Sequence, residues 1–193
     1  THCESSAASD VYKRQALGRT GKMYVCEHFD VEPDMLVIGK GLGGGVFPMA
    51  ALLANDDLNV VEDKALGHYT HEKSSVGCAA ALATIDCLME DGLLDNAVTL
   101  GNSGLQQLEA LKLKHPIIHE VRGLGLFYGI DLRVDGKPAS NEADSILYHS
   151  LSNGLSYKVG GGSILTLCPP LTINNDELTQ AFNIIENGIN SLN

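Results

Sequence analysis

The chain has 193 residues, of which 44% are hydrophobic and 19% are charged, and its formal net charge is −11. A chain of this length can bury a substantial core as one domain or as two small ones. Nucleic acids and anionic membranes repel so acidic a protein, so we expect no nucleic-acid partner and no membrane partner. No apolar run approaches the roughly 20 residues that span a bilayer, which argues against an integral membrane protein.

The cysteine pattern bears on the redox environment and on metal binding. The five cysteines are odd in number, are scattered, and include no CxxC pair. This pattern excludes a disulfide scaffold and a zinc ribbon, and it favours a reducing compartment. We therefore predict a cytoplasmic protein without a metal site.

The first fifteen residues do not resemble the rest of the chain. They contain no initiator Met, no apolar segment and no cleavage site, which argues against a signal peptide. Residues 5–15 resemble the in-frame translation of a transposon-based sequencing adaptor. We therefore treat residues 1–15 as a non-native or disordered tail and exclude them from the fold prediction, which makes residue 16 an arbitrary entry point into a longer gene.

The region after the tail begins with two short apolar runs on either side of a glycine-rich loop. Residues 35–38 and residues 49–54 each predict a buried strand. The loop between them, residues 39–45, carries Lys40.

Two helices are predicted next. Ser74 and Ser75 are suitable N-cap residues for a long helix rich in Ala and Leu, and Gly92 is a suitable stop. Residues 94–113 predict a second, amphipathic helix, which the His115-Pro116 pair ends.

The remaining residues predict a second set of strands and helices. Asn174 and Asn175 cap the last helix, with acidic residues in its first turn. In chain order, we expect strands at residues 117–121 and 124–132 around Arg122-Gly123, a helix at 141–153, strands at 156–159 and 164–167, and a helix ending at Ile189.

Strands alternate with helices, so the predicted class is α/β or mixed α+β. We place the domain boundary at the break after the second helix. The predicted domains are residues 16–114 and residues 115–193, preceded by the tail of residues 1–15.

The glycine loop has competing interpretations. Gly39, Gly41 and Gly44 match the GxGxxG dinucleotide fingerprint, and an acid (Asp57 or Glu62) lies about twenty residues further on. That fingerprint requires a helix to begin inside the motif, so that the helix dipole meets the pyrophosphate. The residues after Gly44 favour a turn, so we disfavour a dinucleotide site.

The alternative interpretation centres on the lysine. A lysine at the carboxyl end of a strand lies where α/β proteins bind ligands. A desolvated lysine amine can form a Schiff base, and flanking glycines let a flat cofactor approach the backbone. An ordinary solvated loop lysine would fit Lys40 taken alone.

Five segments, in order, resemble the class III (omega) aminotransferase family. Residues 33–45 resemble the family's lysine segment, and the separation of Lys40 from Thr70 is the one that this family shows. The other segments are residues 17–28, 67–83, 121–126 and 167–171, so the resemblance covers essentially all of residues 16–193.

The resemblance implies a fold type I enzyme that uses pyridoxal 5′-phosphate (PLP). The fold would be the C-terminal part of an aspartate aminotransferase-like large domain plus a small α+β domain. Lys40 would form a Schiff base with PLP and would move the substrate Cα proton, and Thr70 would bind the cofactor phosphate. The substrates would be an amine and a keto acid, and the parent enzyme would be a homodimer.

His68 and His71 flank Thr70. Their spacing differs from the i, i+4 pair of a helical zinc site, and no third ligand is evident. We interpret them as substrate contacts in an active-site loop, and a solvated loop remains an alternative.

Two departures from the family pattern affect the expected activity. The family's phosphate-cup glycines and the aspartate that holds the pyridine nitrogen precede the segment present here, so we expect the chain as written to be inactive. Family members that bind α-carboxylates carry an arginine shortly before the Pro-Pro pair, where this chain has Leu165 or, in the adjacent alignment, Thr166. A PLP-dependent lyase or decarboxylase acting on an amino-phosphonate or a related amine is therefore the alternative to a transaminase.

Overall fold

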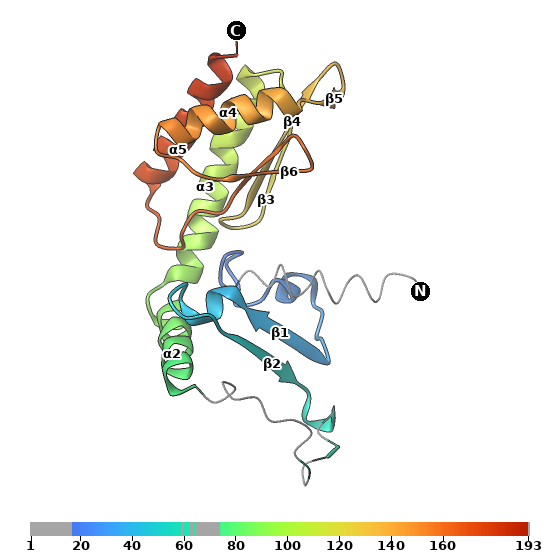
Figure 1. Ribbon diagram of the computed structural model, residues 1–193, viewed down its shortest axis with the longest axis vertical. Helices are drawn as coiled ribbons and strands as arrows, with labels where there is room; N and C mark the ends of the chain where they lie inside the picture. The colour runs from blue at the N-terminus through green and yellow to red at the C-terminus, as the bar shows by residue number, and fades with distance from the viewer. Residues whose placement is uncertain (1–16, 59, 62–63, 65–73, 193) are drawn as a thin grey trace. The chain divides into compact units, whose positions relative to one another are not determined.

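The computed structural model describes residues 17–58, 60–61, 64 and 74–192 (Figure 1). The chain divides into two compact units, and each is described by itself. The first unit takes its described residues from Thr1–Gly18 and Lys22–Leu93, and the second takes them from Arg19–Gly21 and Leu94–Asn193.

The first unit is a β-hairpin with one long helix. Strands β1 (Met35–Gly39) and β2 (Ala50–Ala54) pair antiparallel, with Gly39 opposite Ala50. Helix α2 (Ser75–Glu90) begins where predicted, because the Ser74 side chain accepts a hydrogen bond from the Gly77 amide at 3.2 Å. The short 3-10 helices are η1 (Val25–Phe29), η2 (Lys40–Gly43) and η3 (Asp56–Leu58).

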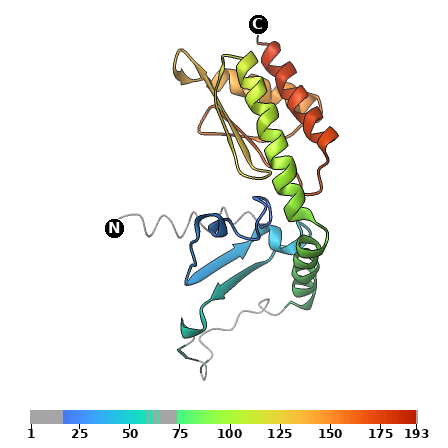
Figure 2. The ribbon, with the colours of Figure 1, turned by 180° about the vertical axis from the view of Figure 1, so that it is seen from behind.

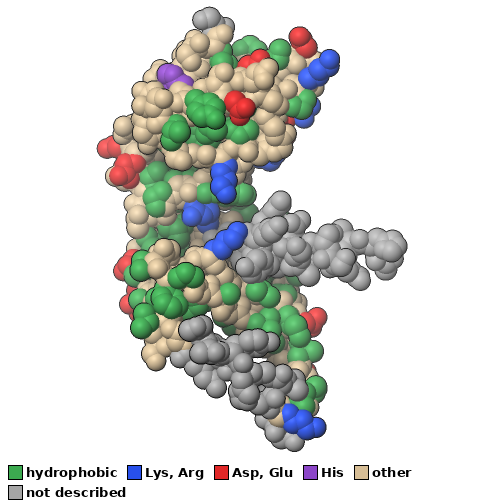
Figure 3. Space-filling view, in the orientation of Figure 1, with side chains coloured by type: hydrophobic (Ala, Val, Ile, Leu, Met, Phe, Trp, Pro, Cys, Tyr) green, Lys and Arg blue, Asp and Glu red, His purple; other side chains and the backbone are tan. Residues whose placement is uncertain are grey.

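The core of the first unit is small. Leu36 and Ile38 of β1 are buried together with Leu42 of η2 and Ala81 of α2. The prediction of two buried strands is only half right, because the residues of β2 are mostly exposed and β1 alternates between buried and exposed positions. A hairpin covered by one helix has one inward face, so every second side chain points outward. Figure 3 shows many hydrophobic side chains at the surface of this unit.

The second unit is an antiparallel sheet packed with three helices (Figures 1 and 2). The strand order is β3-β4-β7-β6, and β5 pairs with β4. The elements in chain order are α3 (Leu93–Lys114), β3 (Ile118–Gly123), β4 (Tyr128–Val134), β5 (Lys137–Pro138), α4 (Ser140–Ser152), β6 (Lys158–Gly160), β7 (Ile164–Leu167) and α5 (Asn175–Asn190).

Local sequence explains where several of these elements begin and end. The predicted cap of α5 is confirmed as a capping box: Asn174 accepts from the Glu177 amide at 2.9 Å, and Glu177 accepts from the Asn174 amide at 3.0 Å. The predicted break between two strands at Arg122-Gly123 is wrong, because β3 continues through both residues. The chain reverses over residues 124–127, where Gly125 adopts a φ of 55°.

The sheet has one apolar face that packs on the helices. Tyr128, Ile130 and Leu132 of β4 and Leu165 and Leu167 of β7 belong to a single buried cluster with residues of α3, α4 and α5. The residues between them on the same strands point to the opposite face, which we call the open face. The domain boundary predicted from sequence places α3 in the first domain, residues 16–114. In the structure, the buried side chains of α3 pack in the core of the second unit.

A close approach of two backbones joins α3 to the sheet. A Cβ placed on Gly101 of α3 would lie 2.5 Å from the Cα atom of Gly125. A Cβ placed on Gly125 would lie 2.5 Å from the Arg19 carbonyl oxygen, and the Leu126 amide donates to that same oxygen at 2.9 Å. Only glycine fits between α3 and the segment at Arg19.

This geometry reverses the usual effect of replacing a helical glycine. Gly101→Ala should lower the free energy of unfolding by about 1–3 kcal/mol, because the new methyl group would overlap backbone that cannot rotate away. In an unconstrained helix the same change would raise stability by about 1 kcal/mol. Thermal unfolding followed by circular dichroism measures the difference, with the exposed Asn102→Ala on the same helix as the control. A stabilised Gly101→Ala protein would contradict the close approach.

Candidate functional site

Lys40 stands at the junction between β1 and the glycine-rich turn. It is the first residue of η2, directly after Gly39, the last residue of β1. Lys40 is exposed, while Ile38 and Leu42 on either side of it are buried. The strand and the buried neighbours therefore fix the backbone while the lysine remains accessible.

The backbone of Lys40 is in the left-handed region, with a φ of 52°. Asp30 and Asp135 are the other non-glycine residues with positive φ among the described residues. Aspartate visits this region readily because its short side chain bonds locally, whereas lysine gains no such compensation. The strain costs on the order of 1–2 kcal/mol, and such strain is concentrated at functional sites.

Helix α2 holds the strained turn in place. Leu42, which is 2% exposed, packs in the cluster that contains Ala81 of α2. A Cβ on Gly44 would lie 3.0 Å from the Thr84 hydroxyl oxygen, and a Cβ on Gly77 would lie 2.9 Å from the Phe47 ring. These close contacts fix the backbone conformation of the turn from several sides. A strained residue persists only where the surrounding packing holds it in this way.

The glycines around Lys40 leave room for a flat ligand. Among the described residues, a Cβ on Gly41 would meet only Leu17, at 3.7 Å, and a Cβ on Gly45 would meet nothing within 4 Å. An accessible lysine beside backbone without side chains suits a cofactor that is held covalently by an amine. The turn therefore fits the lysine's part of a PLP site.

The same geometry argues against a dinucleotide site. The helix that begins at the motif is a single 3-10 turn of four residues, and the next strand, β2, pairs antiparallel with β1. A dinucleotide fold needs an α-helix leading to a parallel strand. The disfavoured interpretation is thus excluded by the topology of the turn.

Three predicted site residues, His68, Thr70 and His71, lie outside the described residues. Within the described part of the chain, no group of three or more His, Cys, Asp and Glu side chains is placed to hold a metal ion. No helix in that part is long and apolar enough to cross a membrane.

The two candidate positions for the expected arginine differ in burial. Leu165 is fully buried in the core of the second unit, so its position could not present a charged side chain to a ligand. Thr166 is half-buried and points to the open face. Of the two positions, Thr166 is therefore the one that lies outside the core, and it supplies a hydroxyl group and no charge.

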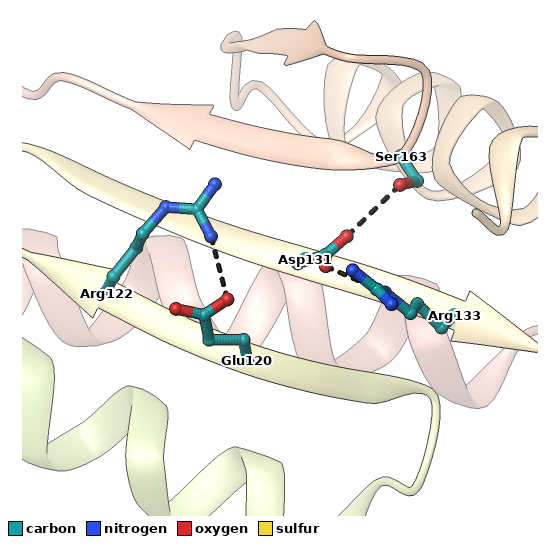
Figure 4. Close-up of polar contacts among 5 residues, drawn as sticks. All are labelled: Glu120, Arg122, Asp131, Arg133 and Ser163. Atoms are coloured by element: carbon teal, nitrogen blue, oxygen red, sulfur yellow. Dashed lines mark hydrogen bonds and ion pairs between the residues drawn. The ribbon is translucent and has the colours of Figure 1, made fainter. Parts of the chain in front are cut away.

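The open face of the sheet carries several charged side chains that sequence reasoning missed (Figure 4). Arg122 Nη1 donates to Glu120 at 3.0 Å, and Arg133 Nε donates to Asp131 at 3.0 Å. The Ser163 hydroxyl donates to the other Asp131 oxygen at 3.2 Å. The two-residue period of the strands could have placed these residues on one face, but only the strand register brings them together.

Titrating groups gather near the end of β7. Burial raises the pKa of the Cys168 thiol, and the nearby Arg19 and Lys158 cations oppose that rise. Arg19 Nη1 also donates to the Pro169 carbonyl. Burial raises the pKa of Tyr128 to about 12, so its hydroxyl stays protonated and donates to the Leu100 carbonyl at 3.1 Å.

A small cavity of about 150 Å³ lies beside this end of the sheet. Its lining includes Tyr157, Leu167 and Pro170. The Tyr157 hydroxyl is hydrogen-bonded to Ser150 at 3.2 Å, and burial raises the Tyr157 pKa.

Comparisons with known proteins agree with this geometry. The family described as "Aminotransferase class-III" matches residues 15–189. The (R)-1-hydroxy-2-aminoethylphosphonate ammonia-lyase of Vibrio splendidus is 42% identical over 90% of this chain and 37% of its own length. Ornithine aminotransferase 1 of Staphylococcus saprophyticus is 37% identical over 88% of this chain and 41% of its own length.

A solved structure extends the likeness to the fold. Acetylornithine aminotransferase from Elizabethkingia anophelis superposes with a TM-score of 0.84 at 35% identity, over 92% of this chain and 46% of that one. The chain thus spans less than half the length of these relatives. It belongs to the class-III aminotransferase family, whose fold is the predicted mixed α/β fold and whose cofactor is PLP.

The strain at Lys40 predicts an ordering of variants. Lys40→Gly should be more stable than Lys40→Ala by about 1 kcal/mol, because glycine accepts a positive φ and alanine does not. Denaturant unfolding without cofactor measures this difference. Lys64→Gly and Lys64→Ala, at an exposed lysine of the same unit, provide the matched comparison. Equal stability of the two Lys40 variants would show that the backbone there is relaxed.

Proposed function

We propose that this chain carries the catalytic lysine of a PLP-dependent enzyme that acts on a primary amine, and that this lysine is Lys40. The observation that carries the proposal is the strained, accessible lysine at the end of β1, buttressed by the buried Leu42. Membership of a family that uses PLP supports it. Thr70 as a phosphate ligand, and His68 and His71 as substrate contacts, are part of the same proposal.

The cofactor and the residues of this chain have separate roles in the proposed reaction. PLP, when bound, supplies an electron sink that makes a substrate Cα–H bond acidic. The Lys40 amine would hold the cofactor covalently and, when free, would move a proton at the substrate Cα atom. The backbone at Gly41 and Gly45 would leave space beside Lys40 for a planar ring. A homodimeric, cytoplasmic parent enzyme belongs to the proposal.

Between the two candidate reactions, Thr166 favours an ammonia-lyase over a transaminase. A transaminase must seat a keto-acid carboxylate in each cycle, and a bidentate arginine is the side chain best suited to that planar group. Thr166 stands where such an arginine would point, and Leu165 is in the core. The relative from Vibrio splendidus, described as an ammonia-lyase acting on an aminophosphonate, supports the same choice.

Covalent trapping tests the role of Lys40 without requiring turnover. Incubating the 193-residue chain with PLP and reducing it with borohydride should label the peptide that contains Lys40, as detected by mass spectrometry. Lys40→Ala should lose this label, and the matched Lys64→Ala protein should keep it. Labelling spread evenly over the lysines, or labelling that survives Lys40→Ala, would overturn the assignment.

The reaction type is tested in the longest natural protein that contains residues 16–193. We expect it to release ammonia from a hydroxylated aminoethylphosphonate with no keto acid present. We expect little amino transfer from ornithine to 2-oxoglutarate, because that acceptor needs a carboxylate grip. Activity that depends strictly on a keto acid would establish the transaminase instead.

A further inference from the structure

One row of residues crosses the open face of the second unit's sheet. Arg122 of β3 pairs with Gly129 of β4, Gly129 pairs with Thr166 of β7, and Thr166 pairs with Lys158 of β6. Directly paired residues of antiparallel strands share a face, so all four point the same way. We call Arg122, Gly129, Thr166 and Lys158 the cationic row.

The middle of the cationic row is shallow. Gly129 has no side chain, and a Cβ placed there would lie 3.6 Å from both Cγ and Nε of Arg122. Arg122 therefore extends from β3 across Gly129, and Figure 4 shows its side chain reaching over the neighbouring strand. Three strand spacings of about 4.8 Å separate the ends of the row, a span that a long arginine and a long lysine can close from both sides.

The charges in the row are accessible. The Arg122 side chain is 49% exposed, and its bond to Glu120 uses one of five guanidinium donors. Lys158 is exposed. The Glu120 and Asp131 carboxylates on this face are each bonded to an arginine of the same face. In a chain of net charge −11, the row therefore offers cationic donors around a hydroxyl group.

We propose that the cationic row binds a dianionic phosphonate group. A phosphonate presents three oxygens on a tetrahedral centre, which suits several donors arriving from different directions. The guanidinium of Arg122, the ammonium of Lys158 and the hydroxyl of Thr166 are three such donors on one face.

Titration of the 193-residue chain with methylphosphonate tests the site by isothermal calorimetry. Methylphosphonate should bind more tightly than acetate at mildly alkaline pH, where the phosphonate is a dianion. Lys158→Met should weaken methylphosphonate binding about tenfold, the effect of losing one charge-assisted hydrogen bond. Thr166→Val should also weaken it, with no change in net charge.

Matched controls separate a specific site from general attraction. Lys137→Met removes the same charge from β5 of the same unit and should leave binding unchanged. Lys158→Arg keeps the positive charge and should keep methylphosphonate binding. Circular dichroism checks that each variant is folded. Equal weakening by Lys158→Met and Lys137→Met, equal affinity for acetate, or no binding at all would overturn the proposal.

The readout is independent of the lysine chemistry. Lys40→Ala should bind methylphosphonate like the unmodified chain, since Lys40 is not in the row. Binding that survives while covalent trapping at Lys40 fails would leave the phosphonate site standing and remove the proposed function. Trapping at Lys40 without methylphosphonate binding would do the reverse.

Discussion

The second unit depends on the absence of side chains at Gly101 and Gly125. Their backbones approach so closely that a Cβ on Gly101 would lie 2.5 Å from the Gly125 Cα atom. Gly125 also sits against the Arg19–Thr20 backbone, and Arg19 in turn donates to the Pro169 carbonyl. A single glycine therefore brings together α3, the β3–β4 turn, the segment at Arg19 and the end of β7.

A similar constraint governs the first unit, but there it stores strain. The turn at Lys40 is pinned by the burial of Leu42 and by the close contacts of Gly44 and Gly77 with α2. The free energy of that packing offsets the cost of holding Lys40 at a positive φ. A relaxed turn would let the lysine adopt many orientations, whereas a pinned turn limits where its amine can reach. Preorganisation of this kind is what covalent catalysis by an amine requires.

The positions of the helices could be predicted from the sequence better than the pairing and packing of the strands. Caps such as Ser74 and Asn174 act within a few residues, so the helix starts follow directly from local chemistry. The predicted strand break at Arg122-Gly123 is wrong because a glycine inside a strand cannot be told from a glycine that ends one without knowing the pairing partner. Lys40 was found through its glycine neighbours and its family resemblance, but its strain could not be read from sequence. Arg122 and Lys158 lie far apart in the chain, and only the register of four strands places them on one row.

The register also explains why one substitution changes what the sheet face can bind. At Thr166 an arginine would place a planar two-donor group at the centre of the face and would crowd Gly129 and the neighbouring Arg122 side chain. With threonine there, the centre stays low, and positive charge comes instead from both edges of the row. A planar carboxylate is bound best by one bidentate guanidinium group, whereas a tetrahedral anion is bound best by donors that converge from several sides. The shape of the accepted anion thus follows from which position in the row carries the charge.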